Sequence, residues 1–147
     1  MGSTFYSLHY HIVFSTKSRR PLLRSAWRAR AHEYLGGTVR GLGDVAEAVG
    51  GVEDHVHLLA SLRTTHNPAD LTRELKKASS VWIAENWEGG FAWQEGYAVF
   101  TVSGTHVGAV RRYVAGQEAH HAKLSFVDEL KHLLERNGVA YDPQYLA

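Results

Sequence analysis

One short segment, residues 52–62, constrains the fold and chemistry of this chain more than any other. Its second half is almost wholly apolar and polar residues bound it on both sides, which is typical of a buried strand. Two histidines, His55 and His57, lie near its start with Val56 between them. Because side chains alternate faces along a strand, both imidazoles should point to the same face of a sheet. Two imidazoles on one face can form half of a site for a divalent metal ion.

A second pair with the same spacing, His9 and His11, competes for this role. It lies in residues 5–15, where apolar and polar side chains alternate with the period of two that predicts a strand. A chain with ten histidines produces such a spacing easily. The spacing therefore leaves both pairs open, as metal ligands or as surface histidines, until a second element completes one of the sites.

The chain of 147 residues is long enough for one domain with a single core, and no linker or repeat divides it. We therefore expect residues 1–147 to form one domain. The absence of cysteine excludes disulfides and thiolate ligands, so a metal would need imidazole, carboxylate or amide ligands. The sequence shows neither an apolar run long enough to span a membrane nor the pattern of a signal peptide, so a cytoplasmic protein is expected.

Basic residues are clustered, although the net charge of +1 does not by itself indicate a partner. Local clusters on a nearly neutral chain suit contacts to phosphates better than general electrostatic adhesion. Solvated helix faces explain each cluster, taken alone, about as well. The candidates for phosphate contacts are Lys17, Arg19, Arg20, Lys76 and Lys77.

The order of the expected elements predicts a compact α+β domain. Strands are expected at residues 5–15, 45–49, 52–62 and 97–103, and helices at about 25–40, 67–88, 105–123 and 125–137. The first six elements have the order of a ferredoxin-like (RRM-like) fold, an antiparallel sheet with helices on one side, and further C-terminal helices follow. The exposed face of such a sheet is a common platform for nucleic acid.

Three helix starts are expected from capping residues. Ser25 is a candidate N-cap of the first helix, Asn67 is followed by a proline at the first helical position, and Ser125 has Asp128 three residues later. Within the third helix, Gly116 should weaken the helix by about 1 kcal/mol relative to alanine.

A candidate for the second half of the metal site lies in this third helix. Tyr113 and Gln117 are four residues apart, so on a helix they share one face about one turn apart. A glutamine amide oxygen can bind a hard cation, and the tyrosine would then stand beside a phosphate that the metal polarises. On the residues alone, a tyrosine at such a position is more often a packing residue than a nucleophile.

The chain resembles the small single-tyrosine HUH transposases of bacterial insertion sequences, including the REP-associated tyrosine transposases. The resemblance runs nearly end to end. It rests on YHIVFSTK at residues 10–17, DHVHLL at 54–59, FAWQEGY at 91–97 and YVAGQE at 113–118. The paired histidines alone are weakly specific, but their combination with the downstream Tyr-x-x-x-Gln and this opening strand is strong.

The resemblance implies an enzyme that cleaves and rejoins single-stranded DNA. In that family the two histidines and the glutamine hold one divalent ion, here His55, His57 and Gln117, with Mg²⁺ or Mn²⁺ as the candidate metals. The tyrosine hydroxyl, here Tyr113 on the C-terminal helices, attacks a phosphodiester and leaves a 5′-phosphotyrosine link and a free 3′-hydroxyl. The family recognises hairpins near the element ends. It acts as a homodimer, whose active sites can combine the histidines of one subunit with the tyrosine helix of the other.

The chemistry of the residues agrees with this role. A tyrosine with a pKa near 10 is mostly protonated at neutral pH and needs help to act as a nucleophile. Because a covalent link conserves bond energy, no nucleotide cofactor is needed, and the chain has no Walker-type phosphate loop. The resemblance favours His55 and His57 as ligands, so His9 and His11 are assigned to the sheet surface near DNA. Glu118 and His121, three residues apart, could ligate a metal, but they are expected to be mainly exposed polar residues.

Two other functions remain as alternatives. One is a non-catalytic single-strand nucleic-acid-binding protein, a domesticated relative that uses the same sheet. Binding alone needs no histidine pair, tyrosine or glutamine in these roles, which argues against it. The other is a metal-dependent phosphodiesterase that uses water, with Tyr113 as a structural residue.

Overall fold

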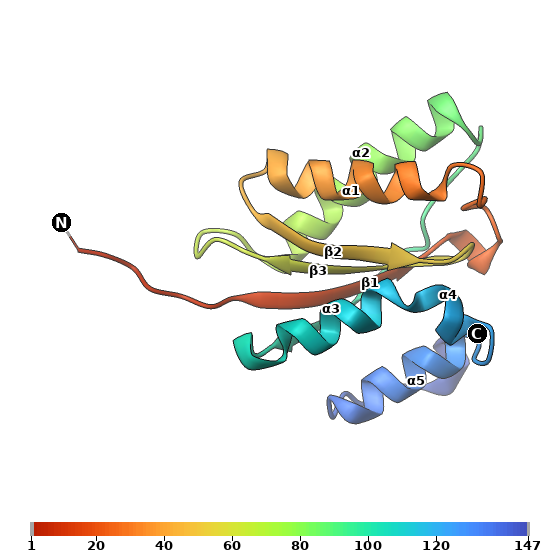
Figure 1. The fold of residues 1–147 in the computed structure, drawn as a ribbon. Helices are drawn as coiled ribbons and strands as arrows, with labels where there is room; N and C mark the ends of the chain where they lie inside the picture. Colours follow the sequence, from red (N-terminus) through yellow and green to blue (C-terminus); the bar gives the residue numbers. More distant parts are fainter. Residues whose placement is uncertain (1, 147) are drawn as a thin grey trace.

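The computed structural model describes residues 2–146 and contains one four-stranded antiparallel sheet in the order β2-β3-β1-β4 (Figure 1). The strands are β1 (His9–Ser15), β2 (Val45–Gly51), β3 (His55–Ser61) and β4 (Ala98–Val102). The helices are α1 (Arg28–Gly41), α2 (Pro68–Asn86), α3 (Val107–Ala115), α4 (Gln117–His121) and α5 (Phe126–Arg136). The α+β, ferredoxin-like order expected from the sequence is therefore confirmed. None of the described helices is long and apolar enough to cross a lipid bilayer.

Helices cover both faces of the sheet. Figure 1 shows α1 and α2 on one face and α3, α4 and α5 on the other. The sheet face that such folds often leave open to nucleic acid is thus covered in this chain by the C-terminal helices. Any site on that face is built between the strands and these helices.

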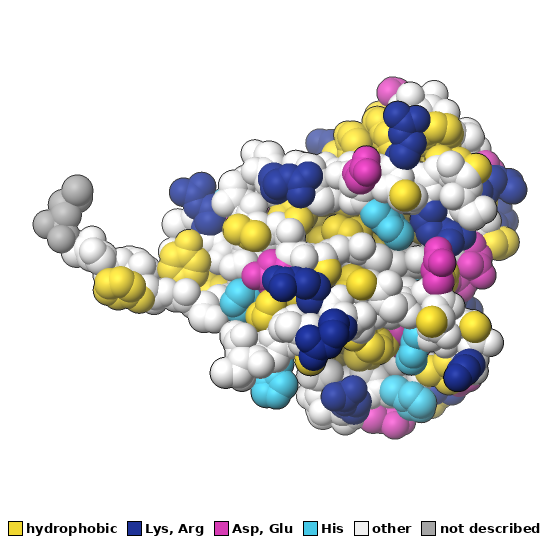
Figure 2. Space-filling view, viewed as in Figure 1, with side chains coloured by type: hydrophobic (Ala, Val, Ile, Leu, Met, Phe, Trp, Pro, Cys, Tyr) yellow, Lys and Arg dark blue, Asp and Glu magenta, His cyan; other side chains and the backbone are white. Residues whose placement is uncertain are grey.

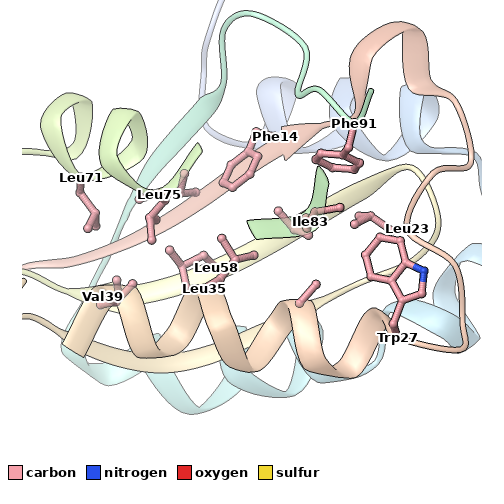
Figure 3. Packing of buried hydrophobic residues seen from close by; sticks show 14 of the residues in the cluster. Phe14, Leu23, Trp27, Leu35, Val39, Leu58, Leu71, Leu75, Ile83 and Phe91 are labelled. Atoms are coloured by element: carbon pink, nitrogen blue, oxygen red, sulfur yellow. The ribbon is translucent and has the colours of Figure 1, made fainter. Parts of the chain in front are cut away.

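The face under α1 and α2 holds the main apolar core. Tyr10, Ile12 and Phe14 of β1 alternate onto this face, and Val56 and Leu58 of β3 do the same. Leucines and valines of the two helices pack against them, as Figure 3 shows. These side chains are removed from water almost completely, so this layer supplies most of the hydrophobic stabilisation.

The opposite face carries the histidines, because the alternation along the strands places them there. His57 of β3 pairs with Val13 of β1, and His55 pairs with Ser15. The apolar cluster on this side is smaller and is formed mainly by Val13, Phe100 and the buried side of α5. The histidines therefore lie in a layer that packs fewer apolar side chains.

Two expected helix starts are confirmed and one is wrong. The Asn67 side chain accepts a hydrogen bond from Asp70 N at 2.9 Å, and the Ser125 side chain accepts one from Asp128 N at 3.2 Å. Ser25 does not cap α1, because the chain makes turns from Arg24 before the helix begins at Arg28. The first strand also begins later than expected, at His9.

The helix expected at 105–123 is divided into α3 and α4 at Gly116. Gly116 has φ −92° and ψ 17°, and its N–H donates to the carbonyls of Arg112 and Tyr113 in a closing turn. The prediction of one continuous helix was therefore wrong. The glycine, which lacks helix propensity, marks the position of the break.

Helix α3 approaches strand β2 at backbone distance. A methyl group added at Gly50 would lie 2.1 Å from the carbonyl oxygen of Val114, so only glycine allows this contact. Val114 itself is fully buried at the same place. The fit between Gly50 and Val114 sets the depth at which the tyrosine-bearing helix lies on the sheet.

Candidate active site

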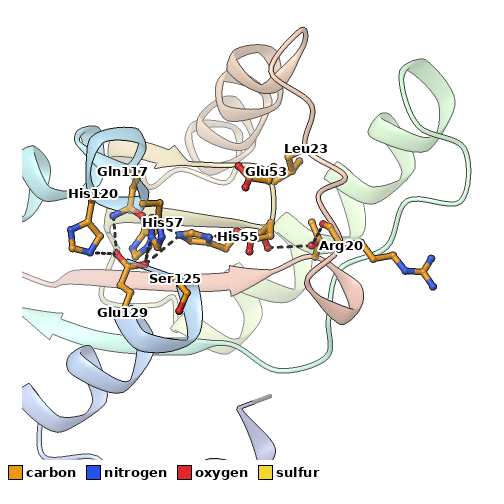
Figure 4. Close-up of polar contacts among 12 residues, drawn as sticks. Arg20, Leu23, Glu53, His55, His57, Gln117, His120, Ser125 and Glu129 are labelled. Atoms are coloured by element: carbon orange, nitrogen blue, oxygen red, sulfur yellow. Dashed lines mark hydrogen bonds and ion pairs between the residues drawn. The ribbon is translucent and has the colours of Figure 1, made fainter. Parts of the chain in front are cut away.

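His55 and His57 lie completely buried on β3, beneath the C-terminal helices (Figure 4). The Nδ1 of His55 lies 2.7 Å from Asp54 Oδ1. An ionised carboxylate accepts hydrogen bonds and cannot donate them. This contact places one imidazole proton on Nδ1, so Nε2 is the ring atom that faces the interior. There Nε2 lies 3.0 Å from Gln117 Oε1. This arrangement suits a histidine that binds a cation through Nε2.

His57 faces the same interior from the next position on that side of the strand. Its Nδ1 contacts Nε2 of His11 at 2.7 Å, and its Nε2 contacts Glu129 Oε1 at 3.0 Å. His11 is therefore buried and supports His57, so its expected place on the exposed sheet surface was wrong. The Nδ1 of His9 instead lies 3.1 Å from Glu47 on the edge strand β2, on the far side of β3. The two histidine pairs have different roles, because only one pair converges with the C-terminal helices.

Tyr113 and Gln117 meet this histidine pair from the last turn of α3 and the start of α4. The Tyr113 hydroxyl donates a short hydrogen bond to Glu129 Oε2, and Gln117 Nε2 donates to the same oxygen at 3.0 Å. Gln117 is buried, whereas the Tyr113 side chain is partly open to solvent. The described chain thus brings its own tyrosine and its own histidines to one place, and Gly116 separates the two helices that carry the tyrosine and the glutamine.

Two further residues belong to the site: Glu129, which the sequence interpretation missed, and His121, for which it favoured an exposed position over a metal-binding role. Glu129 is only 1% exposed, and its Oε1 lies 2.8 Å from His121 Nε2. His121, expected to be exposed, is turned inward because its Nδ1 donates to the carbonyl of Leu124 at 2.6 Å. A readable signal existed, since Glu129 follows Phe126 and precedes Leu133 on the apolar stripe of α5. A carboxylate on a buried stripe is rare unless it is paired or binds a metal.

Neighbouring charges and burial push the pKa values in the cluster in different directions. Burial lowers the pKa of His57 to about 4. Burial also opposes protonation of His55, but hydrogen bonds to Asp54 and Glu129 outweigh it and raise the pKa of His55 to about 9. Burial and the adjacent Glu129 carboxylate raise the pKa of Tyr113 above its usual value. The tyrosine is therefore held as a phenol until a group accepts its proton.

The donor set of the cluster fits a divalent cation. One ligand atom from each of His55, His57, His121 and Glu129 lies within 4.8 Å of the others. Imidazole nitrogens with one carboxylate oxygen are ligands that Mn²⁺ and related ions accept, and the Gln117 amide oxygen adds a hard donor. A buried histidine and glutamate cluster able to bind a metal is thus present where the sequence predicted one.

Tyr113 borders three clefts, and α5 also lines two of them. One has a volume of about 410 Å³ and runs between β4, α3 and α5, where His11, His106 and Arg136 also line it. Another, of about 250 Å³, leads to Glu129 and His120. The tyrosine hydroxyl therefore lies where solvent-accessible space meets the buried cluster.

The predicted phosphate contacts are distributed away from the cluster, and they differ in freedom. Lys17, Arg20 and Lys77 are exposed. Arg19 donates to the carbonyl of Leu146 at 2.8 Å, and Lys76 donates to that of Gln94 at 2.8 Å. These two side chains already hold loops in place. Figure 2 shows further Lys and Arg side chains over the region of α3, where Arg111 and Arg112 are exposed.

Comparison with known proteins gives consistent matches. A model of the family described as "Transposase IS200 like" matches residues 4–117. The ISDra2 transposase TnpA of Deinococcus radiodurans is 30% identical over 76% of this chain and 85% of its own length. A crystal structure of a transposase candidate from D. radiodurans R1 superposes with a TM-score of 0.65 at 26% identity, over 78% of this chain and 93% of that one.

A structure of a REP-associated tyrosine transposase bound to a REP hairpin shares the fold. Its TM-score is 0.55 at 15% identity, over 78% of this chain and 68% of that one. The matched family segment contains His55, His57, Tyr113 and Gln117, whereas Glu129 and His121 lie beyond it. The family match spans most of the sequence, and the overall fold is shared with the solved transposase structures. This chain therefore belongs to the IS200-like transposase family.

Proposed function

We propose that this transposase cleaves and rejoins single-stranded DNA through a covalent 5′-phosphotyrosine at Tyr113. The observation that carries the proposal is the convergence of the Tyr113 hydroxyl, the paired histidines His55 and His57, and Gln117 around one buried carboxylate. Membership in the family supports a DNA-processing role. Nucleic-acid binding alone would not require a phenol beside a cation site.

In the proposed reaction the Tyr113 oxygen attacks the phosphorus of a phosphodiester. A Tyr–O–P bond forms, the P–O3′ bond breaks, and the leaving 3′ oxygen gains a proton. Glu129 Oε2 accepts the Tyr113 hydrogen bond and is therefore the atom placed to receive the phenol proton. The reverse attack by a 3′-hydroxyl restores a phosphodiester, so rejoining needs no nucleotide cofactor.

His55, His57 and Gln117 would hold the divalent ion, Mg²⁺ or Mn²⁺. A bound ion would supply Lewis-acid polarisation of a non-bridging phosphate oxygen. The second nitrogen of each histidine is already engaged, by Asp54 and by His11, which fixes the orientation of both rings. These contacts preorganise the site before any DNA arrives.

The proposed substrate is single-stranded DNA with hairpins near the element ends. The fold is shared with a transposase whose structure was solved with a REP hairpin. The exposed basic residues Lys17, Arg20 and Lys77, together with Arg111 and Arg112 beside the tyrosine, are the candidate phosphate contacts.

We further propose a homodimer in which tyrosine helices can exchange between subunits. Mixing two inactive variants, Tyr113→Phe and His57→Ala, tests the exchange. If subunits share sites, the mixture recovers part of the cleavage activity of wild type, because one composite site then has both intact groups. No recovery from an assembled mixed dimer would contradict exchange.

A covalent-trapping assay tests the reaction itself. Single-stranded oligonucleotides from the DNA flanking the gene are incubated with protein and Mg²⁺ or Mn²⁺ and separated on a denaturing gel. A metal-dependent adduct is expected with wild type and with Tyr141→Phe, whose exposed hydroxyl bonds Glu135 and lies on the chain beyond α5. It should be lost in Tyr113→Phe. Cleavage without an adduct would indicate hydrolysis by water, and binding without cleavage would indicate a nucleic-acid-binding protein.

A further inference from the structure

Glu129 occupies the focus of the buried cluster. Its Oε1 lies 2.8 Å from His121 Nε2, 3.0 Å from His57 Nε2 and 3.3 Å from His55 Nε2. Ligand atoms that share one ion at about 2.1 Å lie roughly 3 Å apart when they are adjacent. The spacing around Oε1 is therefore that of a set of ligands around a common cation.

The hydrogen-bond geometry at this point also suits a positively charged occupant. His55 and His121 each use Nδ1 as a donor, to Asp54 and to the carbonyl of Leu124, so Nε2 is the atom of each ring that faces Glu129. The Glu129 carboxylate oxygen that both nitrogens face carries only lone pairs. These nitrogens and this oxygen repel each other unless protons or a metal ion lie between them. One divalent ion satisfies all of them together.

The second Glu129 oxygen connects this site to the nucleophile. Oε2 accepts the hydrogen bonds of the Tyr113 hydroxyl and of Gln117 Nε2. The position of α5 is fixed independently by Phe126, whose ring stacks on that of His55 with centroids 4.3 Å apart. Glu129, one turn after the Ser125 cap, is thus delivered to the cluster by a well-anchored helix.

We propose that Glu129 is a protein ligand of the divalent metal, supplied by α5 from outside the segment that matches the family. The proposal rests on the proposed metal-dependent function and extends it. One carboxylate oxygen would bind the ion with His55, His57 and Gln117, while the other holds the attacking hydroxyl. Metal affinity and placement of the nucleophile then depend on the same side chain.

Mn²⁺ binding to the full chain, read from the electron paramagnetic resonance signal of the free ion, tests this assignment without any DNA or activity. Glu129→Gln keeps the shape and the hydrogen-bonding capacity of the side chain but removes its charge. We expect it to weaken Mn²⁺ binding at least tenfold. Glu135→Gln, the same change at an exposed position of α5, should bind as wild type does. Equal or tighter binding by Glu129→Gln would overturn the proposal, the latter by marking Glu129 as a competitor of the metal.

Amide hydrogen exchange of the wild-type protein gives a second measurement that needs no folded variant. If Glu129 binds the ion, Mn²⁺ should slow exchange in α5 as well as in β3. Protection of β3 without α5 would overturn the assignment. His57→Ala distinguishes a failure of the Glu129 assignment from a failure of the proposed metal-dependent function. Mn²⁺ binding that is lost in His57→Ala but retained in Glu129→Gln refutes only the Glu129 assignment, whereas no binding by wild type refutes the metal-dependent function as well.

Discussion

The two faces of the one sheet are built from the same strands but by opposite rules. On the face under α1 and α2, side chains such as Phe14 and Leu58 pack into a continuous apolar layer. On the face under α3 to α5, His55, His57 and Glu129 are equally buried but polar, and each is held by several hydrogen bonds. Adjacent residues of one strand therefore serve stability and chemistry separately. The alternation of the strand makes this division possible.

Truncation of two neighbouring residues of β3 tests most directly whether the two faces of the sheet serve stability and chemistry separately. His57→Ala should abolish DNA cleavage, because it would remove a proposed metal ligand. Leu58→Ala should lower the free energy of unfolding by about 2–5 kcal/mol through the cavity it leaves, while the remaining folded protein keeps its activity. Chemical denaturation and cleavage assays on both variants check the separation. Alanine at His9 should only weaken cleavage, since that histidine bonds Glu47 outside the cluster; the reverse pattern would reassign the site.

A second prediction compares glycines on opposite faces. Gly50→Ala places a methyl group 2.1 Å from the Val114 carbonyl, so α3 must move off the sheet. We expect at least a tenfold loss of cleavage and about 1–3 kcal/mol of destabilisation. Gly37→Ala is the matched control, because a methyl group at this exposed position of α1 would meet only the flexible Arg40 side chain, at 3.8 Å. That change should stabilise the protein by up to about 1 kcal/mol. If Gly50→Ala retained full activity, the close docking of α3 would not be needed for the reaction.

Two separate pairs of exposed basic residues mark two alternative paths for single-stranded DNA over the molecule. Removing one basic side chain that binds a phosphate of single-stranded DNA should reduce the slope of log K against log salt by about 0.7. The neutral double variant of Arg111 and Arg112, beside Tyr113, is compared with that of Lys17 and Lys77. Binding titrations at several salt concentrations give the two slopes. An unchanged slope in either variant would remove that pair from the DNA path.

The smallest expected effect concerns a histidine outside the site. His32 on α1 has a buried Nε2 without a hydrogen-bond partner among residues 2–146, and burial with the nearby Arg28 lowers its pKa to about 4. In the unfolded chain the pKa of His32 is near 6.5, so the unfolded state binds the proton more readily. The free energy of unfolding is therefore unaffected by His32 above pH 6.5 and decreases as the pH falls from 6.5 towards 4. His32→Gln should recover on the order of 1 kcal/mol at pH 5 relative to pH 7. Equal pH dependence of unfolding in the variant and wild type would contradict this origin.

Local patterns predicted much of the fold because the relevant physics is local. The alternation in β1 and β3, the Asn67 cap and the Ser125 cap each depend on neighbouring residues and are found in the structure. The break at Gly116 is also local, and the sequence analysis noted the glycine, but its cost of about 1 kcal/mol was taken as too small to divide the helix. The start of α1 was misplaced because turns from Arg24 replaced the expected cap.

The remainder of the site depends on contacts between distant segments. The burial of His11 follows from the helices that cover the second face, which lie far along the chain, and no pattern around His11 encodes them. Glu129 meets His57 across a separation of 72 residues. Its place on the apolar stripe of α5 was the one accessible hint, and the nearby capping residues drew the interpretation to Asp128 instead.

The break at Gly116 has a consequence for how cleaved DNA would travel. Tyr113 lies in the last turn of α3 and Gln117 is the first residue of α4, so one helix does not hold the phenol and the amide rigidly together. A change in the backbone angles of Gly116 would rotate α3 relative to α4 and move a DNA end that is covalently attached to Tyr113. The histidines, Gln117 and Glu129 would stay where they are. The attached DNA end could then move without displacing the residues proposed to bind the metal, as exchange of strands between two cleavage sites requires.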